Sequence, residues 1–439
     1  MTVGGDLVTF ITTDYAGITR GRSFPAADLR PGAGQSMGWV PANMSLTPFD
    51  VIADPNPWGS AGDLRLLADE VARFRVDLPG AATPFDVMIS DITDLAGAPW
   101  PLCPRGMLKA AVADLRAQTG LQIRASFEHE FQLFGTAHGA APAFSLRALR
   151  QVDPFGPALV AACQAAGLMP ETFIAEYGRD QFEITLAPCP AVEAADRAVI
   201  LREITRETAR LMGWSASFAP KNAVDSVGNG VHIHYSLADD RGNPVSYDPA
   251  MPGGASRLMA SFTAGILRHM PALVAITAPS QISGLRLQPH NWSSSHTWFG
   301  DGDREASLRI CPFNRVAGRD AARAFNIEYR PADACACPHL ALAMLIRAGL
   351  EGLRANLPAP PLFSGDPALI SETEHTSLGL HRLPDTLADA LEALLADRVA
   401  CGWLDPLALE TYVGMKRMEI ALVGPVPDDA MCHRYAEIY

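Results

Sequence analysis

The chain has 439 residues, of which 48% are hydrophobic and 19% are charged. This composition is that of a folded globular protein large enough for two or three domains. A formal net charge of −13 argues against a nucleic-acid-binding surface. The apolar runs are shorter than a membrane span, and the N-terminus lacks a secretory pattern, so we expect a cytoplasmic protein with no membrane partner. Eight cysteines without paired spacing predict reduced, mostly buried thiols.

The first hundred residues have the pattern of a small separate unit. Residues 7–12 and 17–23 predict two short strands joined by a turn, and residues 86–92 predict a further strand. A proline-rich linker follows. We therefore predict a domain boundary at residue 104, which divides the chain into domains 1–104 and 105–439.

A predicted strand in the second domain carries the sequence Phe-Glu-His-Glu-Phe over residues 127–131. Side chains alternate along a strand, so Glu128 and Glu130 project from one face and the three ring-bearing residues from the other. On a solvated surface these glutamates need no partner. Inside the protein they would require protonation, basic neighbours or bound cations.

Three later segments repeat this pattern of polar residues on one strand face. Residues 172–186 predict two strands around a turn and carry Glu176 and Glu183. A strand over 231–237, approached by glycines, carries His232 and His234. Residues 326–330 place Glu328 and Arg330 on one face. Helices that would pack behind these strands are predicted over 106–118, 191–212, 338–353 and 383–399.

Together the strands offer five carboxylates and one imidazole, from Glu128, Glu130, Glu176, Glu183, His232 and Glu328. Six such ligands suit two divalent cations, and an oxygen-rich set with one histidine favours Mg²⁺ or Mn²⁺ over zinc. Two such ions beside arginines suit phosphoryl transfer, where charge on phosphate oxygens must be neutralised. The candidate arginines are Arg286, Arg304, Arg309 and Arg330. The sequence has no phosphate-binding loop ending in Lys-Ser/Thr, so a nucleotide must be held in another way.

Taken in order, these motifs resemble the glutamine synthetase superfamily nearly end to end. The motifs are Phe127 to Phe131, Glu176 with Gln181-Phe182-Glu183, Pro220-Lys221 with Gly228 to His234, Asp303 to Arg309, and Ile327 to Arg330 with Asp333. The resemblance implies an α+β fold. It predicts a small N-terminal β-grasp domain and a large C-terminal catalytic domain built on a curved antiparallel sheet.

The resemblance also implies a reaction and the residues that perform it. ATP phosphorylates the γ-carboxylate of glutamate, and an amine displaces phosphate to leave a γ-glutamyl amide. Two to three Mg²⁺ or Mn²⁺ ions are expected, one held by Glu130, Glu176 and Glu183 and another by Glu128, His232 and Glu328. Arg286 and Arg330 would bind glutamate, with Gly228 nearby, while Arg304 and Arg309 would bind phosphates and His234 the nucleotide. The expected catalytic residues are Asp63, Arg304 and Arg330.

Family members form active sites between subunits of stacked hexameric rings, so we expect self-association into a dodecamer. Asp63 would then face the amine pocket of a neighbouring subunit. The tyrosine-bearing loop that is adenylylated in regulated bacterial members has no clear counterpart within residues 357–383. We therefore expect that regulation to be absent.

The chain departs from the family where the amine should bind. Trp292 stands at the position of an acidic flap residue that closes over ammonium in ammonia-using members. An indole cannot accept a proton, but it can pack against an alkyl or aromatic group. We therefore predict an organic amine as acceptor, as in ligases of the γ-glutamylmethylamide or γ-glutamylpolyamine synthetase type. Asn326 is a second departure, because an arginine is usual there.

Three alternatives to this interpretation remain open. The protein could be a glutamine synthetase that uses ammonia, or a structural protein that kept the fold and lost catalysis. The aromatic residues of the flap, residues 289–298, could also simply fill the loop rather than select an amine.

Overall fold

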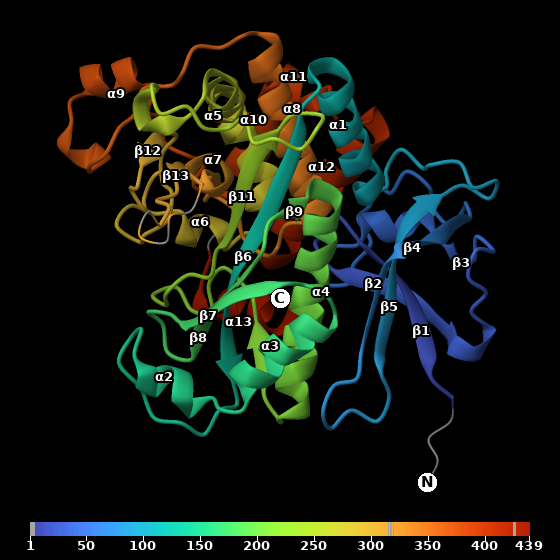
Figure 1. The fold of residues 1–439 in the computed structure, drawn as a ribbon. Coiled ribbons are helices and arrows are strands. Elements are labelled where there is room, and N and C mark those ends of the chain that lie inside the picture. Colours follow the sequence, from blue (N-terminus) through green and yellow to red (C-terminus); the bar gives the residue numbers. More distant parts are fainter. Residues whose placement is uncertain (1–4, 315, 317, 319, 425–426) are drawn as a thin grey trace.

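The computed structural model describes residues 5–314, 316, 318, 320–424 and 427–439 (Figure 1). Two β-sheets organise the chain. The first is built from the N-terminal strands, drawn in blue, and the second runs through the middle of the larger part of the molecule.

The first sheet has five strands in the order β2-β1-β5-β4-β3. Its strands are β1 (Leu7–Thr13), β2 (Thr19–Pro25), β3 (Ser36–Trp39), β4 (Leu64–Val76) and β5 (Phe85–Thr93). The pairing of β1 with β5 is parallel and the others are antiparallel. The predicted hairpin and the strand near residue 90 are therefore confirmed. Strand β4 was not predicted, because a register shift between Ala68 and Arg73 breaks its alternation.

The second sheet has nine strands, and its main path runs β12-β13-β14-β11-β6-β8-β7. Strands β9 and β10 pair with β6 as well, and every pairing except that of β12 with β13 is antiparallel. The strands are β6 (Gln122–Phe134), β7 (Pro170–Ala175), β8 (Gln181–Leu186), β9 (Cys189–Pro190), β10 (Ser215–Ser217), β11 (Val231–Ala238), β12 (Phe299–Asp301), β13 (Leu308–Ile310) and β14 (Ile327–Tyr329). Strand β6 contains the predicted Phe-Glu-His-Glu-Phe segment and is the centre of this sheet.

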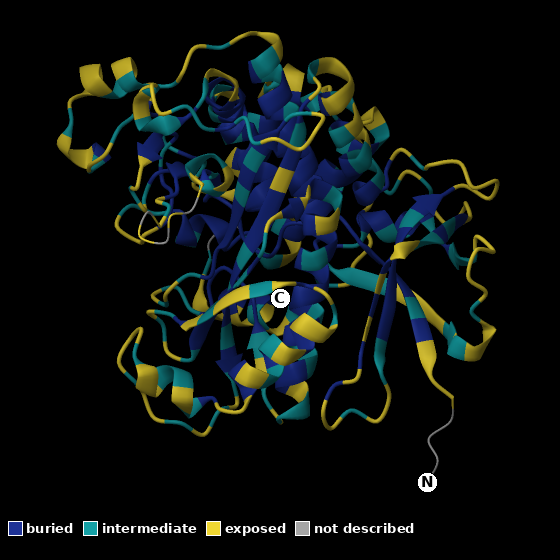
Figure 2. Ribbon diagram, in the orientation of Figure 1, coloured by how far each residue is buried: buried dark blue, intermediate teal, exposed yellow. Residues whose placement is uncertain are grey.

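Helices cover the apolar face of the second sheet. Phe127, His129 and Phe131 are almost fully buried on that face, as the alternation predicted. Helix α4 (Ala191–Leu211) packs on β6, and α8 (Pro338–Arg354) packs on both α1 (Pro104–Thr119) and α5 (Arg257–Thr277). Figure 2 shows β6 and β11 largely buried, while exposed residues gather on outer helices such as α2 (Leu146–Gln151).

The remaining helices lie around this core. They are α3 (Phe155–Ala165), α6 (Ser283–Arg286), α7 (Ala321–Ala324), α9 (Glu372–Leu378), α10 (Leu387–Ala396), α11 (Arg398–Cys401), α12 (Pro406–Val423) and α13 (Asp429–Ile438), with 3₁₀ turns η1 (Ala26–Asp28), η2 (Pro41–Ser45), η3 (Pro252–Gly254) and η4 (Pro367–Leu369).

The helix predicted over 383–399 is wrong at both ends. Helix α10 spans Leu387–Ala396, and Asp397 separates it from the short α11. The Asp397 carboxylate accepts hydrogen bonds from the backbone N–H groups of Val399 and Ala400, which starts a new helix at that point.

Helix α5 was not predicted at all. It has the length and mean hydropathy of a membrane span, but 78% of that window is buried inside the protein. We interpret it as a core helix. Most of its residues between Met259 and Thr277 are buried.

A buried ionic cluster joins the two sheets. The guanidinium of Arg105, in α1, lies 2.9 Å from Asp69 of β4, 3.1 Å from Asp91 of β5 and 2.8 Å from Asp196 of α4. His339 of α8 contacts the same Asp196 carboxylate at 2.8 Å.

The division of the chain at residue 104 stays a prediction. The first sheet ends at Thr93 and α1 begins at Pro104.

Candidate active site

Strand register places the predicted polar residues in a row across the second sheet. The register aligns His232 with Glu128, Glu130 with Glu183, His234 with Glu328, and Arg309 with Glu328. Residues that lie opposite one another in antiparallel strands share a face. Five strands, β6, β8, β11, β13 and β14, therefore contribute to one row of polar residues, which we call the carboxylate row.

One end of this row has the composition of a cation site. Donor atoms of Glu128, His232 and Glu328 lie within 4.8 Å of one another, and His232 Nδ1 is 2.7 Å from Glu128 Oε1. Burial raises the pKa of Glu128, but hydrogen bonds with His232 and His234 outweigh it and hold that pKa well below its usual range. Burial also opposes ionisation of Glu328, yet the neighbouring Arg330 and His234 lower its pKa to about 2. Burial and the charge of Arg330 lower the pKa of His232, so the neutral, ligating form is favoured.

The other end of the row contains carboxylates that repel one another. Burial and then the charge of Glu130 raise the pKa of Glu176 to about 7. Burial and the charges of Glu128, Glu130 and Glu176 raise the pKa of Glu183 to about 10. Glu130 Oε2 accepts a hydrogen bond of 2.6 Å from the Gly230 N–H. Oxygen donors that destabilise one another when ionised fit hard divalent cations, which would stabilise the ionised form.

Two predicted phosphate-binding or substrate-binding arginines lie beside the first group. Arg309 Nη1 is 3.0 Å and Arg330 Nη1 is 2.5 Å from the same Glu328 oxygen, Oε1. The buried Nε atoms of both arginines have no hydrogen-bond partner among the described residues. Buried donors without partners are costly, so these two N–H groups are suited to an anionic ligand.

Arg286 lies next to Gly228 and is buried. Its guanidinium is buried and donates to the carbonyl oxygens of Ala332 at 3.0 Å and Arg330 at 3.2 Å. A Cβ on Gly228 would lie 2.8 Å from Arg286 Cγ, so a glycine is required there. Arg304 is exposed, and its charge lies close enough to Glu176 to favour the ionised form of that carboxylate.

The flap contains two tryptophans in opposite environments. Trp298 is buried against Phe363, so its ring fills the loop. The indole of Trp292 is 67% exposed, and its backbone has a φ of 51°. The Trp292 carbonyl accepts a hydrogen bond of 3.0 Å from Arg330 Nη2. Loop filling therefore accounts for Trp298 and does not account for Trp292.

Sequence reasoning missed Glu305 as a flap contact. Its two carboxylate oxygens accept hydrogen bonds from the backbone N–H groups of His290 and Trp292, each at 3.2 Å. Glu305 belongs to a motif that was recognised, but a contact between two loops leaves no periodic signal.

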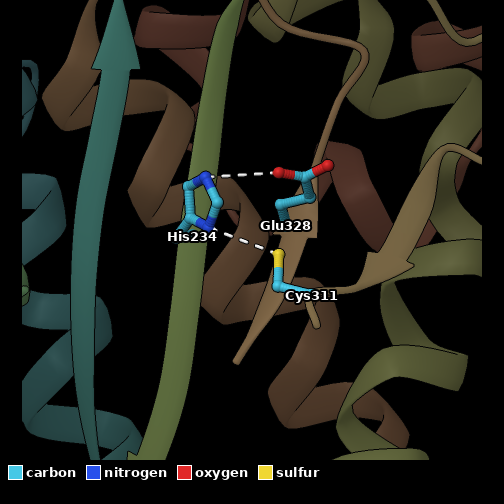
Figure 3. A group of neighbouring side chains, drawn as sticks. All are labelled: His234, Cys311 and Glu328. Carbon is cyan, nitrogen blue, oxygen red and sulfur yellow. Dashed lines mark hydrogen bonds and ion pairs between the residues drawn. The ribbon is translucent and has the colours of Figure 1, made fainter. Parts of the chain in front are cut away.

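Sequence reasoning also missed Cys311, which lies 3.6 Å from His234 Nδ1 (Figure 3). His234 Nε2 lies 3.2 Å from Glu328 Oε2. Cys311 follows β13, two residues after Arg309, so alternation could have placed its thiol on the same face.

Asp63 is not part of the carboxylate row. It is exposed and directly precedes β4 of the first sheet.

The sheet, its carboxylate row and the adjoining arginines suit an enzyme that holds cations next to anionic groups. Residues 101–435 match the family described as "Glutamine synthetase, catalytic domain", and residues 2–100 match "Glutamine synthetase N-terminal domain". The chain belongs to the glutamine synthetase family of ligases. The predicted family and the predicted α+β fold are thus confirmed.

Three relatives illustrate this membership. The chain is 36% identical to "Gamma-glutamylpolyamine synthetase GlnA3" of Streptomyces coelicolor, over 98% of this chain and 92% of that protein. It is 29% identical to "Glutamine synthetase" of Pyrococcus woesei, over 89% of this chain and 85% of that protein. A solved structure titled "Crystal structure of novel glutamine synthase homolog" superposes with a TM-score of 0.92 at 46% identity, covering 100% of this chain and 99% of the other. The roles of individual site residues stay predictions.

Proposed function

We propose that the protein is an ATP-dependent ligase that joins the γ-carboxylate of glutamate to an organic amine and releases ADP and phosphate. We prefer an organic amine to ammonia as the acceptor because the side chain of Trp292 is exposed. An apolar ring can pack against the carbon chain of an amine and leaves ammonium without a carboxylate partner. The 36% identity to a γ-glutamylpolyamine synthetase supports this choice and makes polyamines the first amines to test.

The residues of the row support this chemistry. Glu128, His232 and Glu328 would hold one Mg²⁺ or Mn²⁺, and Glu130, Glu176 and Glu183 another, with two to three ions in all. Such ions neutralise charge on phosphate oxygens when bound. Arg309 and Arg330 both contact Glu328, and each has a buried Nε without a hydrogen-bond partner in the described part of the chain. A glutamate γ-carboxylate oxygen attacks the terminal phosphorus of ATP, giving an acyl phosphate and ADP.

The amine nitrogen then attacks the acyl carbon, phosphate leaves and the nitrogen loses a proton. We assign the acceptor of that proton to Asp63, supplied by an adjacent subunit of a hexameric ring. Arg286, Arg304 and Gly228 would complete the glutamate and phosphate sites, and His234 the nucleotide site.

We also propose that the rings stack into a dodecamer and that the chain divides into domains 1–104 and 105–439. A cytoplasmic location is supported by eight free cysteines, seven of which are buried.

Ammonia is the second candidate acceptor, because relatives such as the Pyrococcus woesei protein carry the name glutamine synthetase. A protein without catalysis is disfavoured. Glu176 and Glu183 repel their neighbours when ionised, and a purely structural protein would gain no stability from keeping them.

The test is phosphate release from ATP with Mg²⁺ and glutamate across ammonia, methylamine, ethanolamine, putrescine and spermidine. We expect kcat/KM for one organic amine to exceed that for ammonia at least about tenfold, the size of discrimination that one apolar contact supplies. Preference for ammonia would identify a glutamine synthetase. No phosphate release with any of these acceptors would support the alternative that the protein is not an enzyme.

A substitution in the flap tests whether Trp292 selects the amine. Trp292→Glu should lower kcat/KM for the organic amine and raise it for ammonia. Phe144→Ala is the matched control, because Phe144 is also an exposed aromatic residue on a loop but lies outside the flap. Equal effects of the two substitutions would contradict a role of Trp292 in amine selection.

A further inference from the structure

Three side chains next to the carboxylate row form a mixed group of sulfur, nitrogen and oxygen donors. They are His234 from β11, Cys311 directly after β13, and Glu328 from β14, and their donor atoms lie within 4.8 Å of one another. Figure 3 shows the carboxylate and the thiol on the same side of the imidazole, with one ring nitrogen facing the carboxylate and the other facing the thiol. Cys311 is 8% exposed and Glu328 is 1% exposed, so strand packing fixes this group in place.

The geometry of this group fits a tetrahedral, sulfur-binding cation. Zinc bonds of about 2.3 Å to sulfur and about 2.0 Å to nitrogen at a tetrahedral angle separate the two donors by roughly 3.5 Å. Cys311 Sγ and His234 Nδ1 are 3.6 Å apart. Asn326 Oδ1 lies 2.9 Å from the same ring nitrogen and offers an oxygen on that side.

The Glu328 carboxylate contacts the second ring nitrogen of His234. Glu328 Oε2 is 3.2 Å from His234 Nε2. A metal-bound imidazole typically donates its second N–H to a carboxylate, which fixes the tautomer and the ring orientation. Here Glu328 would accept that N–H while Nδ1 faces the thiol and the amide oxygen.

This group shares Glu328 with the carboxylate row but differs from it in having a sulfur donor. Thiolate ligands select Zn²⁺ and similar soft cations, whereas carboxylates and carbonyl groups suit Mg²⁺ and Mn²⁺. The row described above contains no sulfur. A cation that binds here would therefore be chemically different from those that the row is expected to hold.

We propose that Cys311, His234 and Asn326, oriented by Glu328, form a second cation site that binds Zn²⁺ or a similar soft cation and inhibits the enzyme. Binding replaces the thiol proton of Cys311, which is released to water, and no electron is transferred. Inhibition follows because Glu328 and His234 are the same residues that we assign to the phosphate-side cation and to the nucleotide. This second step rests on the proposed function, whereas the binding step does not.

The binding step can be measured without substrates. We would titrate the protein with Cd²⁺ in excess Mg²⁺ and follow the ultraviolet charge-transfer band of a thiolate–Cd²⁺ bond. We expect one Cd²⁺ per chain to produce this band. Cys311→Ser should lose the band, and Cys401→Ser, which changes a half-buried thiol in α11, should keep it. Absence of the band from the wild-type protein, or its persistence in Cys311→Ser, would overturn the proposal.

Asn326→Ala gives a second variant that leaves the thiol in place. It should keep the charge-transfer band while binding Cd²⁺ about tenfold more weakly, because even an indirect metal contact contributes about that much. Unchanged affinity would remove Asn326 from the site.

The inhibitory step is measured by amide formation at saturating Mg²⁺ with increasing Zn²⁺, each variant being compared with its own rate without Zn²⁺. The Zn²⁺ concentration for half inhibition should rise at least about tenfold in Cys311→Ser and stay unchanged in Cys401→Ser. Equal inhibition of all three proteins would show that Zn²⁺ acts at the carboxylate row and would contradict the inhibitory role. A wild-type protein that binds Cd²⁺ through Cys311 but forms no amide would refute the proposed function alone.

Discussion

Glu305 holds the flap backbone at two positions. Its carboxylate accepts the N–H groups of His290 and Trp292, while Arg330 donates to the Trp292 carbonyl. The backbone around Trp292 is therefore held from both sides, and the indole remains free to contact a substrate. A charged acceptor at a partly exposed position makes hydrogen bonds of modest but measurable strength.

We expect Glu305→Ala to raise KM for the organic amine roughly fivefold, which corresponds to the loss of about 1 kcal/mol of hydrogen bonding. The change in kcat should be smaller, because Glu305 positions the flap and does not contact the reacting atoms. Steady-state kinetics with varied amine and saturating ATP and glutamate measure both constants. Glu372→Ala, which removes an exposed acid from α9, is the control. An unchanged KM in Glu305→Ala would contradict this role.

His296, at the other end of the flap, predicts a pH dependence of stability. Burial, followed by the charges of Arg382 and His375, lowers its pKa to about 4, although Asp366 and Asp385 act in the opposite direction. In the unfolded chain the pKa is near its ordinary value of about 6.5. The folded state therefore binds fewer protons than the unfolded state between these two values. The stabilising effect of the neutral imidazole is complete above about pH 6.5 and is lost as the pH falls towards 4.

His296→Gln should accordingly reduce the fall in thermal unfolding temperature between pH 7 and pH 5. The comparison is made against the wild-type protein and against His433→Gln, which alters an exposed histidine. An equal fall in all three proteins would show that His296 does not titrate as its surroundings indicate.

At the level of residues, the sequence predicts those parts of the site that lie on strands. Alternation placed Glu128 and Glu130 on one face, and the register of β6, β8, β11 and β14 then aligned the predicted row. The spacing of Cys311 from Arg309 could have placed it on the face of the site, whereas Glu305 was missed because its partners lie on another loop. Such contacts depend on how loops and strand ends meet, which no spacing within one segment records.

Helices α5 and α8 show that glycine can determine how closely two elements pack. A Cβ on Gly265 would lie 2.7 Å from the Gly352 amide nitrogen and closer still to the Ala348 carbonyl oxygen. Ser261 Oγ donates to the Gly352 carbonyl at 2.8 Å across the same contact. The backbones of α5 and α8 therefore touch. Helix α5 in turn packs on the second sheet, where Phe262 contacts Tyr235 of β11.

Gly265→Ala should destabilise the protein by about 1–3 kcal/mol, because an additional methyl group must force the two helices apart. The control is Gly414→Ala in α12, where a Cβ would meet nothing within 4 Å. That change should be neutral or stabilise by up to about 1 kcal/mol, since alanine is the better helix former. Urea unfolding midpoints measure both effects. A similar midpoint shift for the two variants would contradict the close backbone contact.

At the level of elements, prediction succeeded where periodicity was regular and failed where it was interrupted or absent. The ends of β6 and α4 were placed within a few residues, because Gly120, Gly135 and Gly213 mark them. Strand β4 was missed at its bulge, and the break at Asp397 because a side-chain cap restarts the helix.

At the level of the whole molecule, one predicted catalytic residue lies apart from the others. The carboxylate row and the arginines lie on the second sheet, whereas Asp63 is exposed beside the first sheet. A ring in which the first sheet of one subunit meets the second sheet of the next would bring Asp63 to a neighbouring site. The exposure of Asp63 in the single chain would then be a consequence of assembly.

Mixed oligomers test this arrangement. Asp63→Ala and Glu328→Ala should each be inactive alone, because every site then lacks either the acid or a cation ligand. Random mixing of the two chains in one ring pairs an intact Asp63 with an intact Glu328 at about one site in four, so about a quarter of wild-type activity should return. Co-expression with two affinity tags, purification through both tags and amide-formation assays measure the recovery. The matched control is a mixture of Glu328→Ala with Glu128→Ala, whose defects lie on the same sheet. This mixture should recover nothing if each site takes its whole carboxylate row from one chain. Equal activity of the two mixtures would show that Asp63 does not act across a subunit boundary.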